Sequence, residues 1–156
     1  MKKKLVAVAA TVGMALGMTV VTAPAASAAS AGDCIGNRCG GVKNRTGKLM
    51  HYTTDLSDGP PGGCDVWNGE GGPVPWFKAM KCTHTPLPEG NAGGKGSGTD
   101  VDAYTFNYQG YHERHTRLGP WRWRQKGVWT KILTNEFADC SIGANNEIWC
   151  TMLVQK

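Results

Sequence analysis

The chain has 156 residues, and its 17 lysines and arginines against 12 acidic residues give a formal net charge of +5. This length suffices for one domain but hardly for two. The modest charge argues against a general nucleic-acid binder, because such proteins are usually far more basic.

The first 28 residues have the pattern of a bacterial secretory signal peptide. Lys2, Lys3 and Lys4 precede an apolar run from Leu5 to Val21, and Ala26-Ser27-Ala28 forms an A-x-A cleavage site. We expect cleavage after Ala28, which removes three lysines and lowers the formal charge from +5 to +2. The alternative is an uncleaved membrane anchor, but small residues interrupt the run. No later run has the ~18 apolar residues that a spanning helix needs. The sequence therefore predicts a secreted, extracellular protein without a membrane anchor.

Residues 29–41 are predicted to be a short Gly-rich lead-in to a single β domain that spans residues 42–156. The segment Val42 to Asp55 is typical of a hairpin, with a turn at residues 44–47 and a second strand over residues 48–54.

The middle of the chain is rich in turn signals. A Gly/Pro turn at residues 58–63 precedes a predicted short strand over Cys64 to Trp67, and Trp76-Phe77 is expected to open another buried piece that leads to Cys82. The segment His84 to Thr99 has two prolines and five glycines, so we expect it to be the longest flexible loop.

The last third of the chain has the clearest strand signals. Polar and apolar residues alternate over Asp100 to Tyr108 and again over Trp121 to Arg124, and period two is the signature of a strand. Val128 to Leu133 is β-branched and aromatic. The strongest helix candidate, Thr134 to Asp139, is barely two turns long. A hairpin is predicted from the strands Phe137–Ser141 and Glu147–Val154, with a turn at residues 143–146.

Because no window shows a persuasive helical period, we expect an all-β fold, a compact disulfide-stapled β-sandwich or small barrel. Six cysteines in a small exported chain indicate a disulfide framework. They allow 15 connectivities, and sequential pairing is predicted because each pair brackets a predicted turn or loop. The alternative, metal ligation, lacks a C-x-x-C motif. The expected pairs are Cys34/Cys39, Cys64/Cys82 and Cys140/Cys150.

Catalytic motifs are weak, and no catalytic residue, metal or cofactor is predicted. His112-Glu113-Arg114-His115 lacks the H-E-x-x-H spacing of metalloproteases and is interpreted as a polar loop between strands. Gly96-Ser97-Gly98 is not a G-x-S-x-G nucleophile elbow. Asp100 and Asp102 are interpreted as solvated carboxylates that precede a strand, rather than calcium ligands.

A cluster of arginines and tryptophans is the strongest candidate binding site. In the alternating run, two indoles should face one way and two guanidinium groups the other, and both residue types are enriched at protein interface hot spots. Two alternatives remain open: the indoles lie in the core while the arginines are solvated, or the patch binds a polyanion. The candidate partner-binding residues are Arg114, Arg117, Trp121, Arg122, Trp123 and Arg124.

Three passages give the chain a resemblance to a family of small secreted actinobacterial proteins. They are Cys64-Asp65-Val66-Trp67, residues 128–132 (VWTKI) and residues 138–143 (ADCSIG). The family it resembles most is that of the small adaptor subunits of umbrella toxin particles. This resemblance implies partners: a lectin-like component and a large stalk-like, toxin-bearing protein. In that family the segment before the domain is offered to a partner's cleft; here it is short, from Ala29 to Gly41, and is partly closed by Cys34 and Cys39.

The sequence thus favours a secreted, non-enzymatic protein-protein interaction module, an adaptor in an extracellular antibacterial toxin complex. A peptidase inhibitor is the first alternative, with the loop from Cys64 to Cys82 and its Pro73 and Pro75 as the inhibitory segment. A small secreted hydrolase is the second. It would require His51, His84, His112 or His115 to converge with a carboxylate or a nucleophile in a cleft. Two of these histidines within hydrogen-bond reach of a carboxylate in a pocket would count in its favour.

Overall fold

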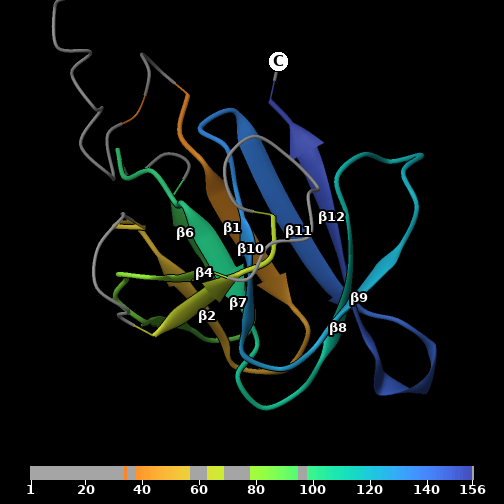
Figure 1. The fold of residues 1–156 in the computed structure, drawn as a ribbon. Helices are drawn as coiled ribbons and strands as arrows, with labels where there is room; N and C mark the ends of the chain where they lie inside the picture. Colours follow the sequence, from red (N-terminus) through yellow and green to blue (C-terminus); the bar gives the residue numbers. More distant parts are fainter. Residues whose placement is uncertain (1–33, 35–37, 57–62, 69–77, 95–97, 156) are drawn as a thin grey trace, which may run out of the picture.

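A computed structural model describes residues 34, 38–56, 63–68, 78–94 and 98–155, and within them the chain is an all-β sandwich (Figure 1). Twelve strands in these residues form two six-stranded sheets. The strand order of the first sheet is β6 (Ala92–Gly94), β1 (Gly41–Arg45), β11 (Glu136–Ile142), β12 (Ile148–Val154), β8 (Tyr111–Arg114) and β9 (Arg122–Arg124). The order of the second is β4 (Lys78–Met80), β3 (Cys64–Val66), β10 (Val128–Lys131), β7 (Ala103–Thr105), β2 (Met50–Thr53) and β5 (Thr85–Leu87). The predicted fold class is confirmed.

The main core lies between the two sheets. Because side chains alternate along a strand, every second residue of β1, β8, β11 and β12 points inward. Tyr111 on β8 crosses the core, and its hydroxyl lies 2.8 Å from both Val128 O and Thr130 Oγ1 on β10. The largest buried side chains of this core include Met50, Tyr104, Phe106, Tyr111, Ile132, Ile148 and Met152.

The second sheet is covered on both faces. Tyr104 on β7 packs into the main core, whereas the neighbouring Ala103 packs with Trp129, Val66 and Cys64 in a smaller cluster. Within β7, successive residues therefore face two buried sides rather than a buried side and a solvated one.

The carboxylates Asp100 and Asp102 are not solvated, so that interpretation is wrong. Asp100 is buried and accepts hydrogen bonds from the Gly40 amide and, at 3.0 Å, from the Thr134 hydroxyl. Asp102 is half-buried and accepts one from the Leu56 amide at 3.0 Å. Buried backbone amides need hydrogen-bond acceptors, and these two carboxylates supply them to Gly40 and Leu56. Each carboxylate therefore links two segments that are distant in the sequence.

The C-terminal hairpin is confirmed. Strands β11 and β12 pair antiparallel with Cys140 opposite Cys150, and the turn is a short 3-10 segment (Ala144–Asn146) with positive φ at Asn145 and Asn146. The helix candidate over residues 134–139 is wrong, because Glu136 to Asp139 lie in β11. Its alternation of buried and half-buried residues fits a strand at the centre of a sheet.

The N-terminal hairpin is wrong in its pairing, although both strands exist. β1 pairs with β11 and β6, and β2 pairs with β7 and β5, so the turn crosses from one sheet to the other. Asn44 fixes this crossing, since its amide nitrogen donates to Lys48 O at 2.7 Å and Leu87 O at 2.8 Å. Both Val42 and Met50 consequently face the same core.

The segment His84 to Thr99, predicted to be a flexible loop, instead contributes an edge strand to each sheet. β5 pairs with β2, and β6 pairs with β1. Gly93 allows β6 to pass close to the Tyr52 ring, because a Cβ there would lie 3.1 Å from Tyr52 Cε1. Gly93 therefore permits close packing of this strand, which the glycine-rich composition of the segment does not by itself indicate.

All three sequential disulfides are present: Cys34–Cys39, Cys64–Cys82 and Cys140–Cys150. They are consistent with an oxidising environment. In the described part of the chain, no helix has the length and apolarity needed to cross a membrane. The predicted signal peptide (residues 1–28) and the residues Pro73, Pro75, Trp76 and Phe77 lie outside the described residues.

Candidate functional site

The strand β9 sets the position of the predicted arginine and tryptophan residues. As expected, indoles and guanidinium groups lie on opposite sides. Trp121 and Trp123 are 38% and 52% exposed, whereas Arg124 is only 7% exposed. The interpretation that puts the indoles in the core and the arginines in solvent is therefore wrong, because the sheet turns the opposite side of this strand inward.

An aromatic row crosses the outer side of the first sheet. His112 stacks on Trp149 with ring centroids 4.1 Å apart, and it meets Trp123 edge-on at 4.9 Å. Trp121 is perpendicular to Trp149 at 4.7 Å. The strand register explains this row, since His112 lies opposite Trp123 on one side and Trp149 on the other.

Arginines border the aromatic row and line a hollow of about 410 Å³. The Arg114 guanidinium carbon lies 4.2 Å from the centroid of the Trp121 ring, and its Nε donates to Thr151 Oγ1 at 3.1 Å. Arg45 is paired with Asp139 at 2.7 Å. We call this surface the Trp/Arg face; its residues are Arg45, His112, Arg114, Arg117, Trp121, Trp123 and Trp149.

Two glycines leave room for the indoles of the Trp/Arg face. A Cβ at Gly110 would lie 2.3 Å from Trp123 Cζ2, and a Cβ at Gly143 would lie 2.5 Å from Trp149 Cδ1. Side chains do not tolerate such distances. Each glycine therefore allows an indole to lie directly against the backbone.

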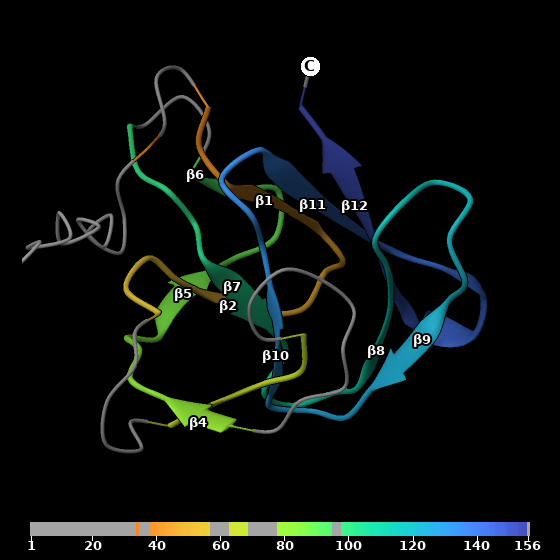
Figure 2. The ribbon, with the colours of Figure 1, turned by 45° about the horizontal axis from the view of Figure 1, so that its top comes forward.

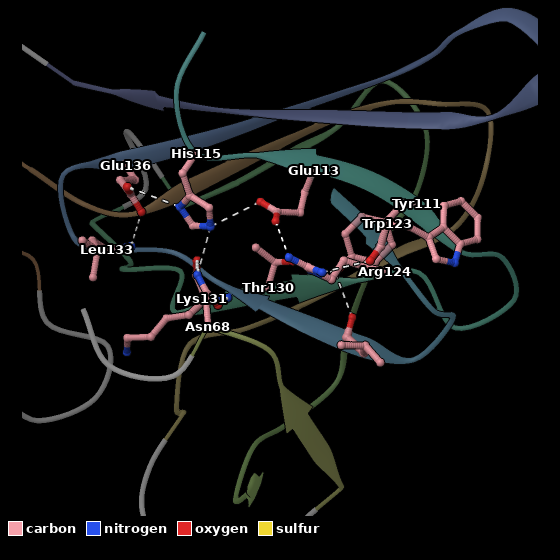
Figure 3. A network of polar contacts seen from close by, with 11 residues as sticks. Asn68, Tyr111, Glu113, His115, Trp123, Arg124, Thr130, Lys131, Leu133 and Glu136 are labelled. Carbon is pink, nitrogen blue, oxygen red and sulfur yellow. Dashed lines mark hydrogen bonds and ion pairs between the residues drawn. The ribbon is translucent and has the colours of Figure 1, made fainter. Parts of the chain in front are cut away.

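A buried ion pair supports the strand pair β8–β9 from the inner side (Figure 3). Arg124 Nη2 donates to Glu113 Oε1 at 2.6 Å, and its Nη1 donates to Trp123 O at 2.9 Å. The guanidinium carbon also lies 3.3 Å from the centroid of the Trp67 ring. Arg124 thus fixes the backbone of the residue that carries an exposed indole.

Figure 3 shows His115 between two glutamates. Its Nε2 lies 3.2 Å from Glu113 Oε2, and its Nδ1 lies 3.9 Å from Glu136 Oε1. The Asn68 amide is held by the backbone of Lys131, and its nitrogen lies 3.2 Å from His115 Nε2. The motif at residues 112–115 is therefore mostly strand β8, and the interpretation of it as a polar loop is wrong.

Burial raises the pKa of the Glu113 carboxyl above its ordinary value, while His115 and Arg124 act in the opposite direction. Burial likewise lowers the pKa of Arg124, against the attraction of Glu113. Each charge is costly to bury alone, so the two groups depend on each other.

The candidate residues divide into two groups. Arg114, Arg117, Trp121 and Trp123 belong to the outer Trp/Arg face, whereas Arg122 and Arg124 lie on the inner side near Trp67. Sequence reasoning missed Arg45, His112 and Trp149. The alternation of Ile148, Cys150 and Met152 could have placed Trp149 outward, but only the sheet order brings Arg45 to the same hollow.

In the part of the chain that the structure describes, no two of the four histidines lie within hydrogen-bond reach of a carboxylate. His115 alone of the four lies within 4 Å of a carboxylate there. The rings of His51 and His84 lie edge to face with centroids 6.3 Å apart, and His112 stacks on Trp149. Cys64, Cys82 and His84 lie close enough to hold a metal ion, but the two sulfurs form a disulfide and offer no thiolate.

Comparisons with models of protein families, with curated proteins and with solved structures found no match to this chain.

Proposed function

We propose that this protein is a secreted, non-enzymatic binding module that docks other proteins on its Trp/Arg face. The observation that carries the proposal is the pair of exposed indoles, Trp121 and Trp123, held beside Arg114 on an outer sheet surface. Tryptophan and arginine are the residue types most enriched at interface hot spots.

The rigidity of the Trp/Arg face supports this proposal. His112 stacks on Trp149, and Trp121 packs perpendicular to Trp149. Arg114 is hydrogen-bonded to Thr151, and the buried Glu113–Arg124 pair holds β9 from the inner side of the sheet. Because these side chains are already held in place, they would lose little conformational entropy when a partner docks on them. Pre-organisation of this kind raises affinity.

An adaptor needs a second surface, and the lead-in is the candidate. It is closed by the Cys34–Cys39 disulfide, and its base is held by Gln155, whose Nε2 donates to Cys39 O at 2.7 Å. Figure 2 shows β8 and β9 at the side of the molecule away from β4 and β5, and β1, the first strand after Cys39, beside β6 and β11. The adaptor role in an extracellular toxin assembly, with lectin-like and stalk-like partners, remains a proposal that rests on the family resemblance.

The test is capture of partners from the culture medium of the source bacterium. Tagged wild-type protein and the double variant Trp121→Ser/Trp123→Ser would be purified from the medium, and copurifying chains identified by mass spectrometry. We expect defined secreted proteins with the wild type and their loss with the double variant, because hot-spot truncation costs about 2 kcal/mol or more per residue.

Tyr108→Ser is the matched control, because Tyr108 is a 79% exposed aromatic residue that does not line the Trp/Arg face. It should retain all captured chains. Equal capture by the double variant and the control would contradict the proposal.

The hydrolase alternative has one observation in its favour, the position of His115 between Glu113 and Glu136 beside a hollow. It ranks second because the same carboxylates bind Arg124 and the Leu133 amide. Screening peptide, ester and glycan substrates with the wild type and with His115→Ala separates the two functions. Turnover that disappears in His115→Ala would favour the hydrolase.

A further inference from the structure

We propose that the partner segment bound by the Trp/Arg face is an acidic polypeptide stretch, whose carboxylates are held by Arg114 and Arg117. This inference rests on the proposed binding function and specifies the chemistry of the partner. The hollow has an excess of positive charge, and two of its aromatic rings each have one face covered.

The hollow carries unbalanced positive charge. Its charged lining residues are Arg45, Arg114, Arg117 and Asp139, and Asp139 is paired with Arg45. Within the described residues, Arg117 makes no ion pair, and the terminal nitrogens of Arg114 make no hydrogen bond. Two guanidinium groups therefore remain for a ligand, and guanidinium binds carboxylate with two parallel hydrogen bonds.

Two aromatic rings of the hollow, Trp149 and Trp121, each have one face covered by a side chain of the same protein. His112 covers one face of Trp149, and the Arg114 guanidinium lies over a face of Trp121. Less of these two rings is therefore open for stacking on a sugar ring. The guanidinium groups beside them suit a polypeptide with carboxylate side chains.

The end of strand β12 adds an apolar surface beside the arginines. A second hollow shares Arg117 and Leu153 with the first and is otherwise lined by His115, Thr116, Met152 and Val154. An extended acidic segment that crosses Arg117 could therefore place apolar side chains against Leu153 and Val154. Alternate residues of such a segment project in opposite directions, about 7 Å apart on each side.

A second copy of this chain is a poor occupant of the same surface. A symmetric dimer would place Arg114 and Arg117 of both copies together, and like charges in an interface cost several kcal/mol. Charge complementarity thus favours an acidic partner over a second copy of this chain at the Trp/Arg face.

The experiment is a titration of the full-length secreted protein with two synthetic peptides, followed by tryptophan fluorescence and calorimetry. One peptide alternates glutamate and threonine, and the other replaces every glutamate by glutamine. We expect binding of the glutamate peptide only, weaker at about 0.5 M salt than at about 0.05 M. The double variant Arg114→Gln/Arg117→Gln should lose about tenfold or more in affinity.

The matched control is Arg38→Gln/Lys81→Gln, which removes the same charge from exposed positions that do not line the hollow. It should stay within about twofold of the wild type. Absence of glutamate-peptide binding, or binding that survives Arg114→Gln/Arg117→Gln, would overturn the inference. An oligogalacturonate that binds in an Arg114- and Arg117-dependent way, while the glutamate peptide does not, would also overturn it and assign the face to anionic sugars.

These failures differ from failure of the proposed function. If partner capture is lost in Trp121→Ser/Trp123→Ser but the glutamate peptide does not bind, the Trp/Arg face is an interface. Only the proposal of an acidic partner segment is then wrong. If capture is unaffected by that variant, the binding function itself is wrong.

Discussion

The Glu113–Arg124 pair joins the buried and the exposed sides of strand β9. Both side chains lie out of solvent, and Arg124 also holds the backbone carbonyl of Trp123. Buried ion pairs add little net stability, but loss of one partner is costly. The pair therefore matters most for keeping the exposed indole in place.

Removal of one member should be more harmful than removal of both. We expect Glu113→Leu to cost about 3–5 kcal/mol of unfolding free energy, because the Arg124 charge remains buried without its partner. The double variant Glu113→Leu/Arg124→Met should recover most of that loss. Chemical denaturation of the wild type, both single variants and the double variant measures the coupling. Additive single effects would show that the two residues do not stabilise each other.

Asp102 gives a pH dependence with a definite sign. Burial raises its pKa to about 6, although the Leu56 amide and Lys131 act in the opposite direction. Since the folded carboxyl holds its proton more tightly than the unfolded one, its contribution to stability is present below about pH 4 and is lost as the pH rises through about 6.

Asp102→Asn removes this titration and keeps an acceptor for the Leu56 amide. We expect the variant to gain about 1 kcal/mol relative to the wild type between pH 4 and pH 7, once solvent screening is allowed for. Denaturation at a series of pH values measures the difference. Asp65→Asn, at an exposed position, is the control. A pH-independent difference for Asp102→Asn would contradict the account.

Individual residue environments were only partly accessible from the sequence. Alternation correctly separated Trp121 and Trp123 from Arg122 and Arg124, because period two is a local property of a strand. It did not reveal which side faces the core. The side that faces the core is determined by residues in other segments of the chain. Glu113 accepts a hydrogen bond from the Arg124 guanidinium, and the Trp67 ring lies against it.

At the scale of elements, strands were easier to predict than their partners. The hairpin β11–β12 is local, and its turn and disulfide mark it in the sequence. The pairing of β1 with β11 joins residues almost a hundred positions apart, and no local signal specifies it. The glycines of residues 84–99 suggested a loop, yet Gly93 and Gly94 lie in the edge strand β6, where Gly93 allows a close approach to the Tyr52 ring.

The disulfide of the C-terminal hairpin should contribute to stability without determining the fold. We expect Cys140→Ala/Cys150→Ala to lose about 3 kcal/mol, because the bridge closes a loop of about ten residues in the unfolded chain. The loss of Cys34–Cys39, which closes a shorter loop, should cost about 2 kcal/mol. Thermal and chemical unfolding compare the two variants. A larger effect for the lead-in bridge would contradict this order.

The turns before β8 and after β11 should control the Trp/Arg face through their glycines. Gly110→Ala and Gly143→Ala should displace the indoles of Trp123 and Trp149, since a new Cβ would lie within 2.5 Å of each ring. We expect altered near-ultraviolet circular dichroism and weaker partner capture, with strand content unchanged. Unchanged capture by both variants would separate the glycines from the binding surface.

At the scale of the whole molecule, two sheets and three disulfides form a rigid frame for one unusual surface. Solvent-facing sides of sheets are usually polar, but here aromatic rings and arginines of β1, β12, β8 and β9 lie on the outer side of one sheet, with Asp139 and Ser141 of β11 between β1 and β12. The sequence predicted the frame and part of this surface. The sheet order, which places β1 and β9 in the same sheet, supplied the remainder.

The most direct test of the proposed binding function is hydroxyl-radical footprinting of the protein alone and in the assembly that is captured with the tagged chain. Oxidation of each tryptophan, read by mass spectrometry, reports its exposure. We predict that Trp121 and Trp123 react readily in the free protein and are protected in the assembly, while Tyr108 reacts equally in both. Equal oxidation of Trp121 and Trp123 in the two states, with protection elsewhere, would contradict the assignment of the Trp/Arg face as the interface.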